Sequence, residues 1–400
     1  MISSLVYGMP FFFCFSFMTL LGFGPSLMSK IVIFSAVIFF CLNHKKVIIN
    51  FLVGWGKYNK LIFSISFFAL SSLVFHQLHG DYMEVVRAIF YFILIAFCTG
   101  FFYKEIPWRW VEFSLAIGAV SIFSYSSYEY FILGHARVGA YINEIIFAQA
   151  VFSIFFLNFI LFIYNVKVKY SAGAILHLLS SFLCLASIIW SGTRGVWVAL
   201  PVSLVLCLYY LVHNGVKIAT IVKFLLVCVL ALIVLFGRDV SLRFYQAKND
   251  ITMAKVEQDY SASSLGGRLY VWKAALMMAT EHPLLGVGRD RFEQRISEYV
   301  AEKRIEPQQQ VFPHAHNGYL NALAMNGVVG LCSYILFMIS PILLIDNRRL
   351  FSLSSLSLLS LVISYAIFSL TDVPFIYQIN IYMYLFSAVL LLKIDDRMAN

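Results

Sequence analysis

Charged residues are scarce in this sequence. Asp, Glu, Lys and Arg together make up 12% of its 400 residues, whereas hydrophobic residues make up 61%. Soluble domains carry roughly twice that charged fraction. The composition therefore excludes an ordinary soluble domain and indicates a polytopic membrane protein. The formal net charge of +9 does not indicate nucleic-acid binding, because most of the basic excess lies in short connections, where the positive-inside rule places it.

Several familiar chemical signatures are also absent. All seven cysteines lie in apolar runs, so we expect neither a disulfide framework nor a thiolate metal site. The sequence has no P-loop, no G-x-S-x-G and no paired aspartates in its long polar segment, residues 238–315. We therefore expect no ATP, no metal ion and no other cofactor. Arginines, rather than Mg²⁺, would have to neutralise a phosphate-bearing substrate.

Apolar runs of membrane-spanning length recur along the chain. A bilayer core about 30 Å thick needs about 20 apolar residues in a helix. The runs predict an all-α polytopic membrane protein with about twelve transmembrane helices, nine of them in residues 1–237 and three in residues 316–400, which end in a short cytoplasmic tail. Pro201 weakens one of these predicted helices. The candidate spans are residues 5–24, 29–43, 59–76, 84–103, 109–130, 144–164, 170–190, 194–213, 217–237, 317–345, 350–370 and 376–392.

The distribution of Lys and Arg predicts the topology. They concentrate in every second connection and in the C-terminal tail, which places that side in the cytoplasm. The polar segment 238–315 then forms one large periplasmic loop. We expect two helices in it. The first is "GGRLYVWKAALMMATEHP", ended by Pro283, and the second is the amphipathic "RDRFEQRISEYVAEKRI", with Phe292, Ile296 and Val300 on one face.

Two histidines precede an apolar run in "FPHAHNGYLNALAMNGVVG", residues 312–330. Asn317 is a good N-cap, so a helix should begin directly after it. His316 then lies at the positive end of a helix, which disfavours imidazolium and suits a general base. Two alternatives stay open: His314 and His316 are ordinary polar residues at the membrane interface, or they bind a metal with further ligands.

Two arginines stand in glycine-containing stretches. "SGTRGVWVAL", residues 191–200, places Arg194 in a short turn on the predicted periplasmic side. Arginine is costly at membrane depth, and its planar fork matches phosphate oxygens. "GGRLYVWK", residues 266–273, places Arg268 near the start of a loop helix, where the glycine pair would allow close approach of a ligand. The plainer interpretations are that Arg194 snorkels to the membrane interface and that Arg268 is an ordinary exposed side chain of a charged loop.

Together these stretches resemble the O-antigen ligase and polymerase superfamily of bacterial cell envelopes. His316, Asn317, nine further residues, Gly327 and Gly330 match the ligase pattern H-[NSQ]-x9-G-x-x-G without departure. "SGTRG" resembles the S-x-[ST]-R-G element of the superfamily. "GGRLYVWK" and the later "HPLLGVG" resemble G-R-x-x-x-W followed by P-L-x-G-x-G. The resemblance covers about residues 190–330 at motif level.

The resemblance implies an inverting glycosyltransferase at the periplasmic face of the bacterial inner membrane. Its donor would be O-antigen on undecaprenyl diphosphate, and its acceptor would be a sugar hydroxyl of lipid A-core, both reaching the site from the membrane lipids. His316 would be the base, and Arg194 and Arg268 would hold the donor diphosphate. The chemistry fits, because a glycosyl diphosphate has a good leaving group and needs cations more than a general acid. The second-tier site residues are His314, Asn317, Arg289 and Arg137.

Three other activities are compatible with parts of this pattern. An O-antigen polymerase would use the same donor with an undecaprenyl-linked acceptor, and the full histidine–glycine pattern favours the ligase. A protein O-glycosylating transferase shares the superfamily motifs. A transporter or flippase would place its polar residues near the membrane midplane, whereas here they cluster at one interface and in the polar segment.

Overall fold

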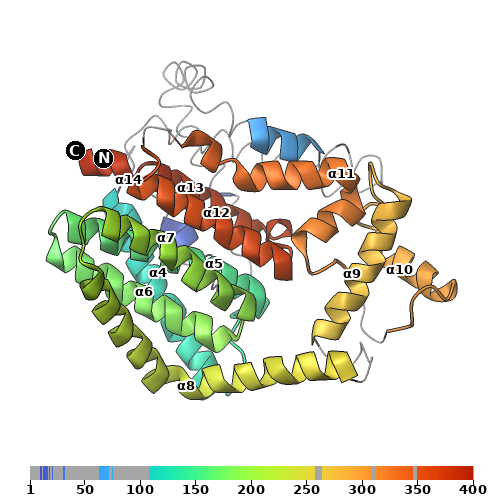
Figure 1. The fold of residues 1–400 in the computed structure, drawn as a ribbon, viewed down its shortest axis with the longest axis horizontal. Coiled ribbons are helices and arrows are strands. Elements are labelled where there is room, and N and C mark those ends of the chain that lie inside the picture. Colours follow the sequence, from blue (N-terminus) through green and yellow to red (C-terminus); the bar gives the residue numbers. More distant parts are fainter. Residues whose placement is uncertain are drawn as a thin grey trace.

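The computed structural model describes residues 10, 12–16, 18, 20, 30–31, 63–71, 74, 108–256, 264–308, 312–345 and 349–399. Within these residues the regular structure is entirely helical, and no β-strand occurs (Figure 1). The predicted spans 5–24, 29–43 and 84–103 lie wholly or largely outside the described residues, and of the span 59–76 the structure describes residues 63–71 and 74, which are helical. The helices from residue 108 onward are α4 (Trp108–Ser127), the π-helix η1 (Tyr128–Ile132), α5 (Glu144–Lys167), α6 (Ser171–Ser191), α7 (Arg194–His213), α8 (Ile218–Val256), α9 (Ser264–Glu281), α10 (Arg291–Ala301), α11 (Gly318–Ile339), the 3-10 helix η2 (Ile342–Leu344), α12 (Leu353–Thr371), the 3-10 helix η4 (Pro374–Ile376), α13 (Gln378–Leu392) and α14 (Ile394–Ala399).

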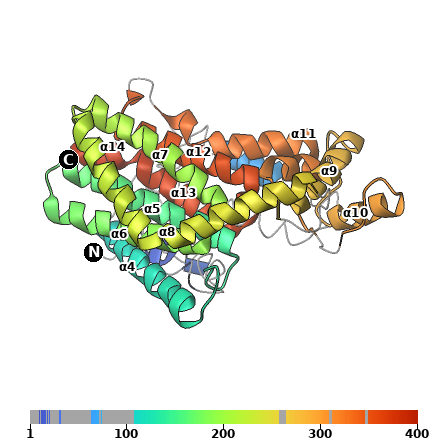
Figure 2. The same ribbon diagram turned by 60° about the horizontal axis from the view of Figure 1, so that its bottom comes forward.

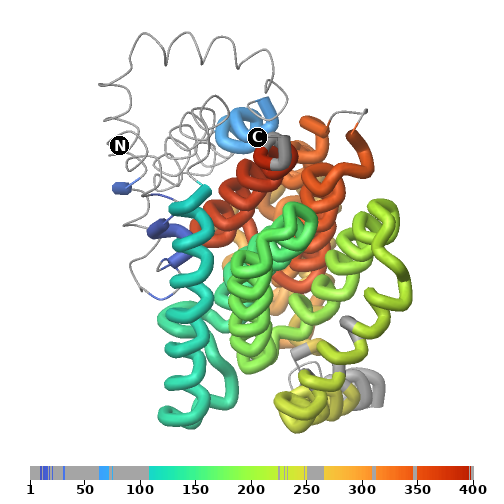
Figure 3. The backbone as a smooth tube through the Cα atoms, turned by 90° about the vertical axis from the view of Figure 1, so that its left-hand side faces the viewer, coloured from blue at the N-terminus to red at the C-terminus, as the bar shows by residue number. Residues whose placement is uncertain are grey.

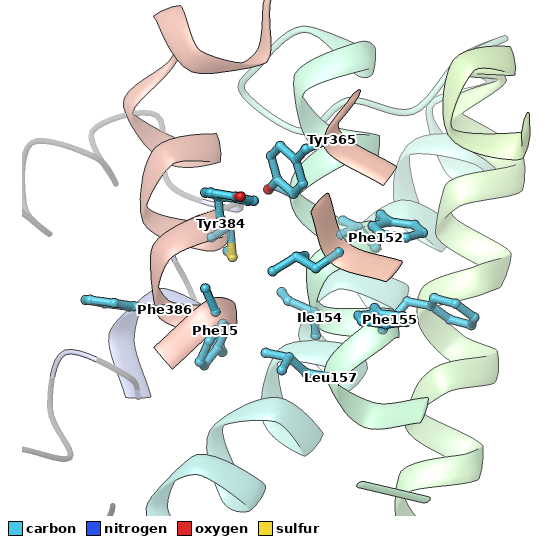
Figure 4. Close-up of a cluster of buried hydrophobic side chains, with 14 of the residues drawn as sticks. Phe15, Phe152, Ile154, Phe155, Leu157, Tyr365, Tyr384 and Phe386 are labelled. Carbon is cyan, nitrogen blue, oxygen red and sulfur yellow. The ribbon is translucent and has the colours of Figure 1, made fainter. Parts of the chain in front are cut away.

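Helix α5 lies at the centre of the bundle, with α4, α6, α12 and α13 around it (Figures 1 and 3). Its sequence is apolar on every face, and 89% of its most apolar window is buried, as expected for a helix surrounded by others. Aromatic side chains fill the contacts, as where Phe152 meets Phe368 of α12 edge to face at 5.2 Å. Figure 4 shows this core, in which α5 side chains meet Tyr365 of α12 and Tyr384 of α13.

The outer faces of the bundle are apolar as well. Large hydrophobic side chains on α6 and α7 point outward, and Ile175, Leu179, Val198 and Val205 are each 58–60% exposed. In water such a surface would aggregate, so it is suited to lipid. The described residues contain five helices long and apolar enough to cross a membrane, or six if the bent pair in α8 is one span. The protein is therefore a multi-pass α-helical membrane protein, and the predicted total of about twelve spans extends over residues that the structure does not describe.

Helix boundaries agree with the hydropathy in most places. Helix α11 ends at Ile339, six residues before the predicted end at residue 345, and α8 differs by more. Helix α7 coincides with the predicted span 194–213 and accommodates Pro201 in its interior. Helix α8, in contrast, continues to Val256, beyond the boundary predicted at residue 237. It bends by 70° between Ile218–Cys228 and Ile233–Gln246, and its second limb extends toward α9 (Figure 2). Hydropathy locates the end of the apolar run, but the polar residues that follow are equally able to remain helical.

The two helices predicted in the polar segment are α9 and α10. Phe292 is fully buried, and Ile296 and Val300 pack partly against the same cluster, as the amphipathic pattern indicated. This cluster includes Ala324 and Met325 of α11, so the segment packs onto that helix.

An ion cluster also holds the polar segment together. Burial raises the pKa of Glu281, but hydrogen bonds from Tyr299, Arg295 and Arg304 outweigh this effect and lower it to about 2. The carboxylate at the end of α9 therefore binds α10 and the turn that follows it.

Candidate active site

Four helix ends meet at one end of the bundle. The Thr193 hydroxyl, directly before α7, donates to the carbonyl oxygen of Glu144, the first residue of α5, at 3.2 Å. The Asn317 amide, directly before α11, donates to the carbonyl oxygen of Leu370 near the end of α12, at 3.3 Å. The candidate histidines and Arg194 therefore lie at the same end of the molecule.

Asn317 is the N-cap of α11, as predicted. Its side-chain oxygen accepts hydrogen bonds from the backbone N–H groups of Tyr319 and Leu320, both at 3.0 Å. Asn321, one turn later, accepts a hydrogen bond from the backbone N–H of Ala315 at 3.0 Å. These bonds fix the backbone on both sides of His316, so Asn317 acts on the site by positioning it.

His316 is held in a strained conformation against a buried carboxylate. Its φ is +47°, a region that residues other than glycine seldom occupy and that often marks functional sites. Its Nδ1 atom is buried and lies 3.6 Å from Oδ1 of Asp372, whose side chain is only 3% exposed. This separation exceeds a direct hydrogen bond, and the carboxylate would attract the ring when the ring carries a positive charge. A carboxylate behind Nδ1 orients the ring so that Nε2 is the nitrogen available for proton transfer.

His314 engages the protein through both ring nitrogens. Its Nδ1 accepts the backbone N–H of His316 at 3.3 Å, and its Nε2 lies 3.2 Å from the Tyr377 hydroxyl. Since Nδ1 is an acceptor, a neutral ring carries its proton on Nε2 and donates to Tyr377. Burial, together with the nearby His316 and Arg289, lowers the pKa of His314 to about 4. The His314 ring is therefore neutral near pH 7, and both of its nitrogens are already occupied by contacts within the protein.

The glycines of the histidine motif form a close backbone contact. Helix α11 is broken at Gly327, where φ is +65° and ψ is −163°, a region open almost only to glycine. A Cβ atom there would lie 2.2 Å from the carbonyl carbon of Leu284. Across this contact Val328 N–H donates to Pro283 O at 2.8 Å, and Val287 N–H donates to Ala324 O at 2.9 Å. The P-L-x-G-x-G and G-x-x-G elements therefore dock onto each other.

This docking brings Arg289 to the histidines. The preceding residue, Gly288, has a φ of +83° and donates its N–H to Met325 O at 2.9 Å. Arg289 itself lies within electrostatic range of both His314 and Tyr377. A positive side chain thus borders the histidine cluster from the polar segment.

Arg194 is the first residue of α7 and lies beside the end of α12. A Cβ atom at Gly195 would lie 2.4 Å from Oγ1 of Thr371, the residue directly before Asp372. Arg137 joins this turn from the connection before α5, where its Nε donates to Ser191 O at 2.9 Å. The two arginines and the His316–Asp372 pair therefore occupy one region.

Arg268 lies in α9, just after Gly266 and Gly267, which are buried in the first helical turn. Two residues further on, the ring of Tyr270 is 6.0 Å from that of Phe312, which in turn is 6.3 Å from the ring of His316. The N-terminal half of α9 is thus linked to the histidine segment through two aromatic contacts.

Three side chains of this region were not anticipated from sequence: Asp372, Tyr377 and Arg243. Asp372 and Tyr377 follow α12, and Arg243 lies in the second limb of α8. The only signal for Asp372 was an acidic residue at the end of an apolar run. His314, His316 and Asp372 also offer three ligand atoms within 4.8 Å of one another. A divalent ion is the alternative use of this cluster, and the prediction of a metal-independent site stays a prediction.

Comparison with known proteins shows what this region is similar to. Residues 179–335 match the family model described as O-antigen ligase. An uncharacterized protein of Haemophilus influenzae is 32% identical over 154 residues, which are 38% of this chain and 38% of that protein. The segment matched by the family model contains Arg194, Arg268, His314 and His316, whereas Asp372 follows it in the chain.

Proposed function

We propose that the chain is an O-antigen ligase, a proposal supported by the match of residues 179–335 to the O-antigen ligase family model. In this proposal it moves O-antigen polysaccharide from undecaprenyl diphosphate to a sugar hydroxyl of lipid A-core. The observation that carries the proposal is the His316–Asp372 pair, at 3.6 Å, beside the α7 turn that bears Arg194. A base and a phosphate-binding cation are what transfer from a glycosyl diphosphate requires.

The proposed reaction is a single displacement. His316 Nε2 takes the proton of the acceptor hydroxyl, and the hydroxyl oxygen forms a bond to the anomeric carbon. The bond from that carbon to the diphosphate oxygen breaks, and the departing undecaprenyl diphosphate keeps the electron pair. Asp372 stabilises the imidazolium, while Arg194 and Arg268 stabilise the charge on the leaving group. Asp372 lies behind His316 and is 3% exposed, which disfavours it as the carboxylate nucleophile of a retaining enzyme.

The second-tier residues have supporting roles in this proposal. His314 and Asn317 position the His316 backbone. Arg289, in range of His314, would contact phosphate groups of the acceptor. Arg137 would act with Arg194 on the donor.

The distribution of charge supports a periplasmic active site in the inner membrane. Helix α5 begins at the site and ends at Lys167, and α7 begins at Arg194 and ends four residues before Lys217. The basic connections thus lie at the end of the bundle opposite the site, where the positive-inside rule places the cytoplasm. Residues 238–315 would then be periplasmic.

A lipopolysaccharide gel from a deletion strain, with lipid-linked glycan analysed from the same cells, tests the proposal. Loss of all O-antigen from lipid A-core, with polymer accumulating on its lipid carrier, is the expected result for a ligase. A core capped by a single repeat unit would instead identify a polymerase, which belongs to the same superfamily. An unchanged ladder would refute both activities and return a transporter to consideration.

Complementation then tests the residues. His316→Ala and Arg194→Ala should each fail to restore O-antigen at normal protein level in the membrane. Full restoration by both variants would refute the proposed mechanism.

A further inference from the structure

Three arginines from distant segments converge on the turn between α6 and α7. Arg137 comes from the connection before α5, Arg194 begins α7, and Arg243 lies in the second limb of α8. Arg243 Nη2 donates to Ala136 O at 2.7 Å, and Arg137 Nε donates to Ser191 O at 2.9 Å. Arg137 and Arg194 both lie within electrostatic range of Arg243.

Of the carboxylates described near Arg137 and Arg243, two accept hydrogen bonds from other groups and a third lies at ion-pair distance from Arg137. Asp239, one turn before Arg243, accepts a hydrogen bond from Tyr130 at 2.6 Å. Glu144 lies 3.8 Å from Arg137 Nη1, beyond hydrogen-bonding distance. Glu129 accepts two backbone N–H groups, from Gly139 and Ala140. Gathering like charges is costly, and an anionic ligand would remove that cost.

Gly192 makes the space in which the Arg243 guanidinium lies. A Cβ atom at this position would be 2.6 Å from Nε and 2.7 Å from Cζ of Arg243. Gly192 also has a φ of +63°, so glycine is favoured here for two independent reasons. The arginine fork is thereby held against the turn that bears Arg194.

The limb of α8 that carries Arg243 has an unusual distribution of side chains. Phe236, Asp239 and Arg243, spaced three or four residues apart, face the bundle, where Phe236 contacts Trp190 at 5.7 Å. The exposed side chains of the limb are mixed: Leu242, Phe244 and Tyr245 are 51–68% exposed, and the polar Arg238 and Ser241 are exposed as well. A helix that exposes large apolar and aromatic side chains beside basic ones fits the interfacial margin of a bilayer.

We propose that Arg243 binds a phosphate of the lipid-linked donor together with Arg194 and Arg137. The identity of the phosphate carrier rests on the proposed function, whereas the phosphate chemistry rests on the three guanidinium groups, whose planar forks suit phosphate oxygens. The exposed Leu242, Phe244 and Tyr245 of the limb favour a phosphate delivered on a lipid over one from solution.

Binding of undecaprenyl diphosphate to the full chain in lipid nanodiscs tests this site. Losing one charge-assisted contact should weaken binding about 10- to 100-fold in Arg243→Gln. Arg243→Lys should recover only part of this loss, because lysine lacks the fork. Arg238→Gln, an exposed position on the same helix, should bind like the wild type. Wild-type affinity in Arg243→Gln would overturn the proposal.

A glycine pair separates loss of the site from loss of structure. Gly192→Ala should displace the Arg243 guanidinium and weaken binding in the same direction as Arg243→Gln. Gly215→Ala is the matched control, because Gly215 has a φ of +84° with nothing within 4 Å of an added Cβ. Equal affinity in the two alanine variants would overturn the proposal, since both carry the backbone strain and only one reaches Arg243.

Two further measurements complete the test. One distinguishes a lipid-linked phosphate from a free one, and the other distinguishes failure of the Arg243 site from failure of the proposed ligase activity. Inorganic pyrophosphate should compete weakly, and competition as strong as that of undecaprenyl diphosphate would overturn the lipid-linked site. A wild-type protein that transfers glycan while Arg243→Gln binds normally would refute the role of Arg243 and leave the ligase standing. Weakened binding in Arg243→Gln, in a protein that transfers no glycan, would support the site and refute the ligase.

Discussion

Replacing Asp372 with asparagine should slow glycan transfer without weakening donor binding. Two unit charges about 4 Å apart attract by about 4 kcal/mol at the effective dielectric of a partly buried site. The His316 side chain is 26% exposed, so we reduce this to about 2 kcal/mol for solvent screening. Losing about 2 kcal/mol of transition-state stabilisation lowers the rate about 30-fold. Loss of the orienting carboxylate in a Ser-His-Asp triad costs about 10⁴-fold, which sets an upper bound, because the present contact is longer than a hydrogen bond.

The assay is steady-state transfer with purified protein, lipid-linked donor and lipid A-core. We expect kcat of Asp372→Asn to fall by at least about 30-fold, with the KM for donor nearly unchanged, because the arginines stay in place. Asp290→Asn is the control. Asp290 is exposed and its side chain does not cap α10. The kcat of the Asp290→Asn variant should therefore stay at the wild-type value. A kcat within about threefold of wild type in Asp372→Asn would refute the reasoning.

Four other outcomes follow from the same contacts. Arg268→Lys should lower kcat/KM by about tenfold or more in the same assay, and an unchanged value would remove Arg268 from the donor site. Gly327→Ala should destabilise the fold by about 3 kcal/mol, since it combines backbone overlap with a glycine-only conformation. The control is Gly134→Ala, at a φ of +67° with open space around the added Cβ, which should destabilise the fold by only about 1 kcal/mol. Equal shifts in the unfolding temperature of the two variants would contradict the docking at Gly327. The lowered pKa of Glu281, about 2, contributes stability that is complete above the unfolded value of about 4.3 and is lost as the pH falls through about 2. Glu281→Gln should abolish that part of the acid unfolding profile. Treatment with EDTA should leave transfer unchanged, and a loss restored by one divalent ion would reassign the histidine cluster to a metal.

The sequence predicted those parts of the fold that depend on local pattern. Hydropathy located α5, α6, α7 and α12 to within a few residues, because each lies in a long apolar run bounded by polar residues. The N-cap at Asn317 followed from residue type alone. The extent and bend of α8 could not be predicted from local pattern. Continuation of the helix into "GRDVSLRFYQAKND" depends on contacts such as that between Tyr130 and Asp239, which lie 109 residues apart in the chain.

The site itself was predicted only where its residues belong to short motifs. His316, Arg194 and Arg268 stand in recognisable sequence contexts. Asp372 and Arg243 do not, and they reach the site through packing between helices far apart in the chain. Gly195 against Thr371 and Gly192 against Arg243 are the contacts that bring them there. The local sequence shows that a glycine stands at such a position. It does not show which side chain from elsewhere in the chain packs against that glycine.

The spacing of the histidine–glycine motif has a mechanical explanation. Nine residues, Gly318–Asn326, separate Asn317 from the break at Gly327 and form a helical limb about 14 Å long at 1.5 Å per residue. The polar segment is attached at both ends of this limb, at Gly327 through Leu284 and at His316 through the ring of Phe312. A change in the limb length or in the break would therefore displace Arg289 relative to His314. For this reason we expect substitutions at Gly327 that still fold to lower transfer through the placement of the polar segment, with His316 and Asp372 left in position.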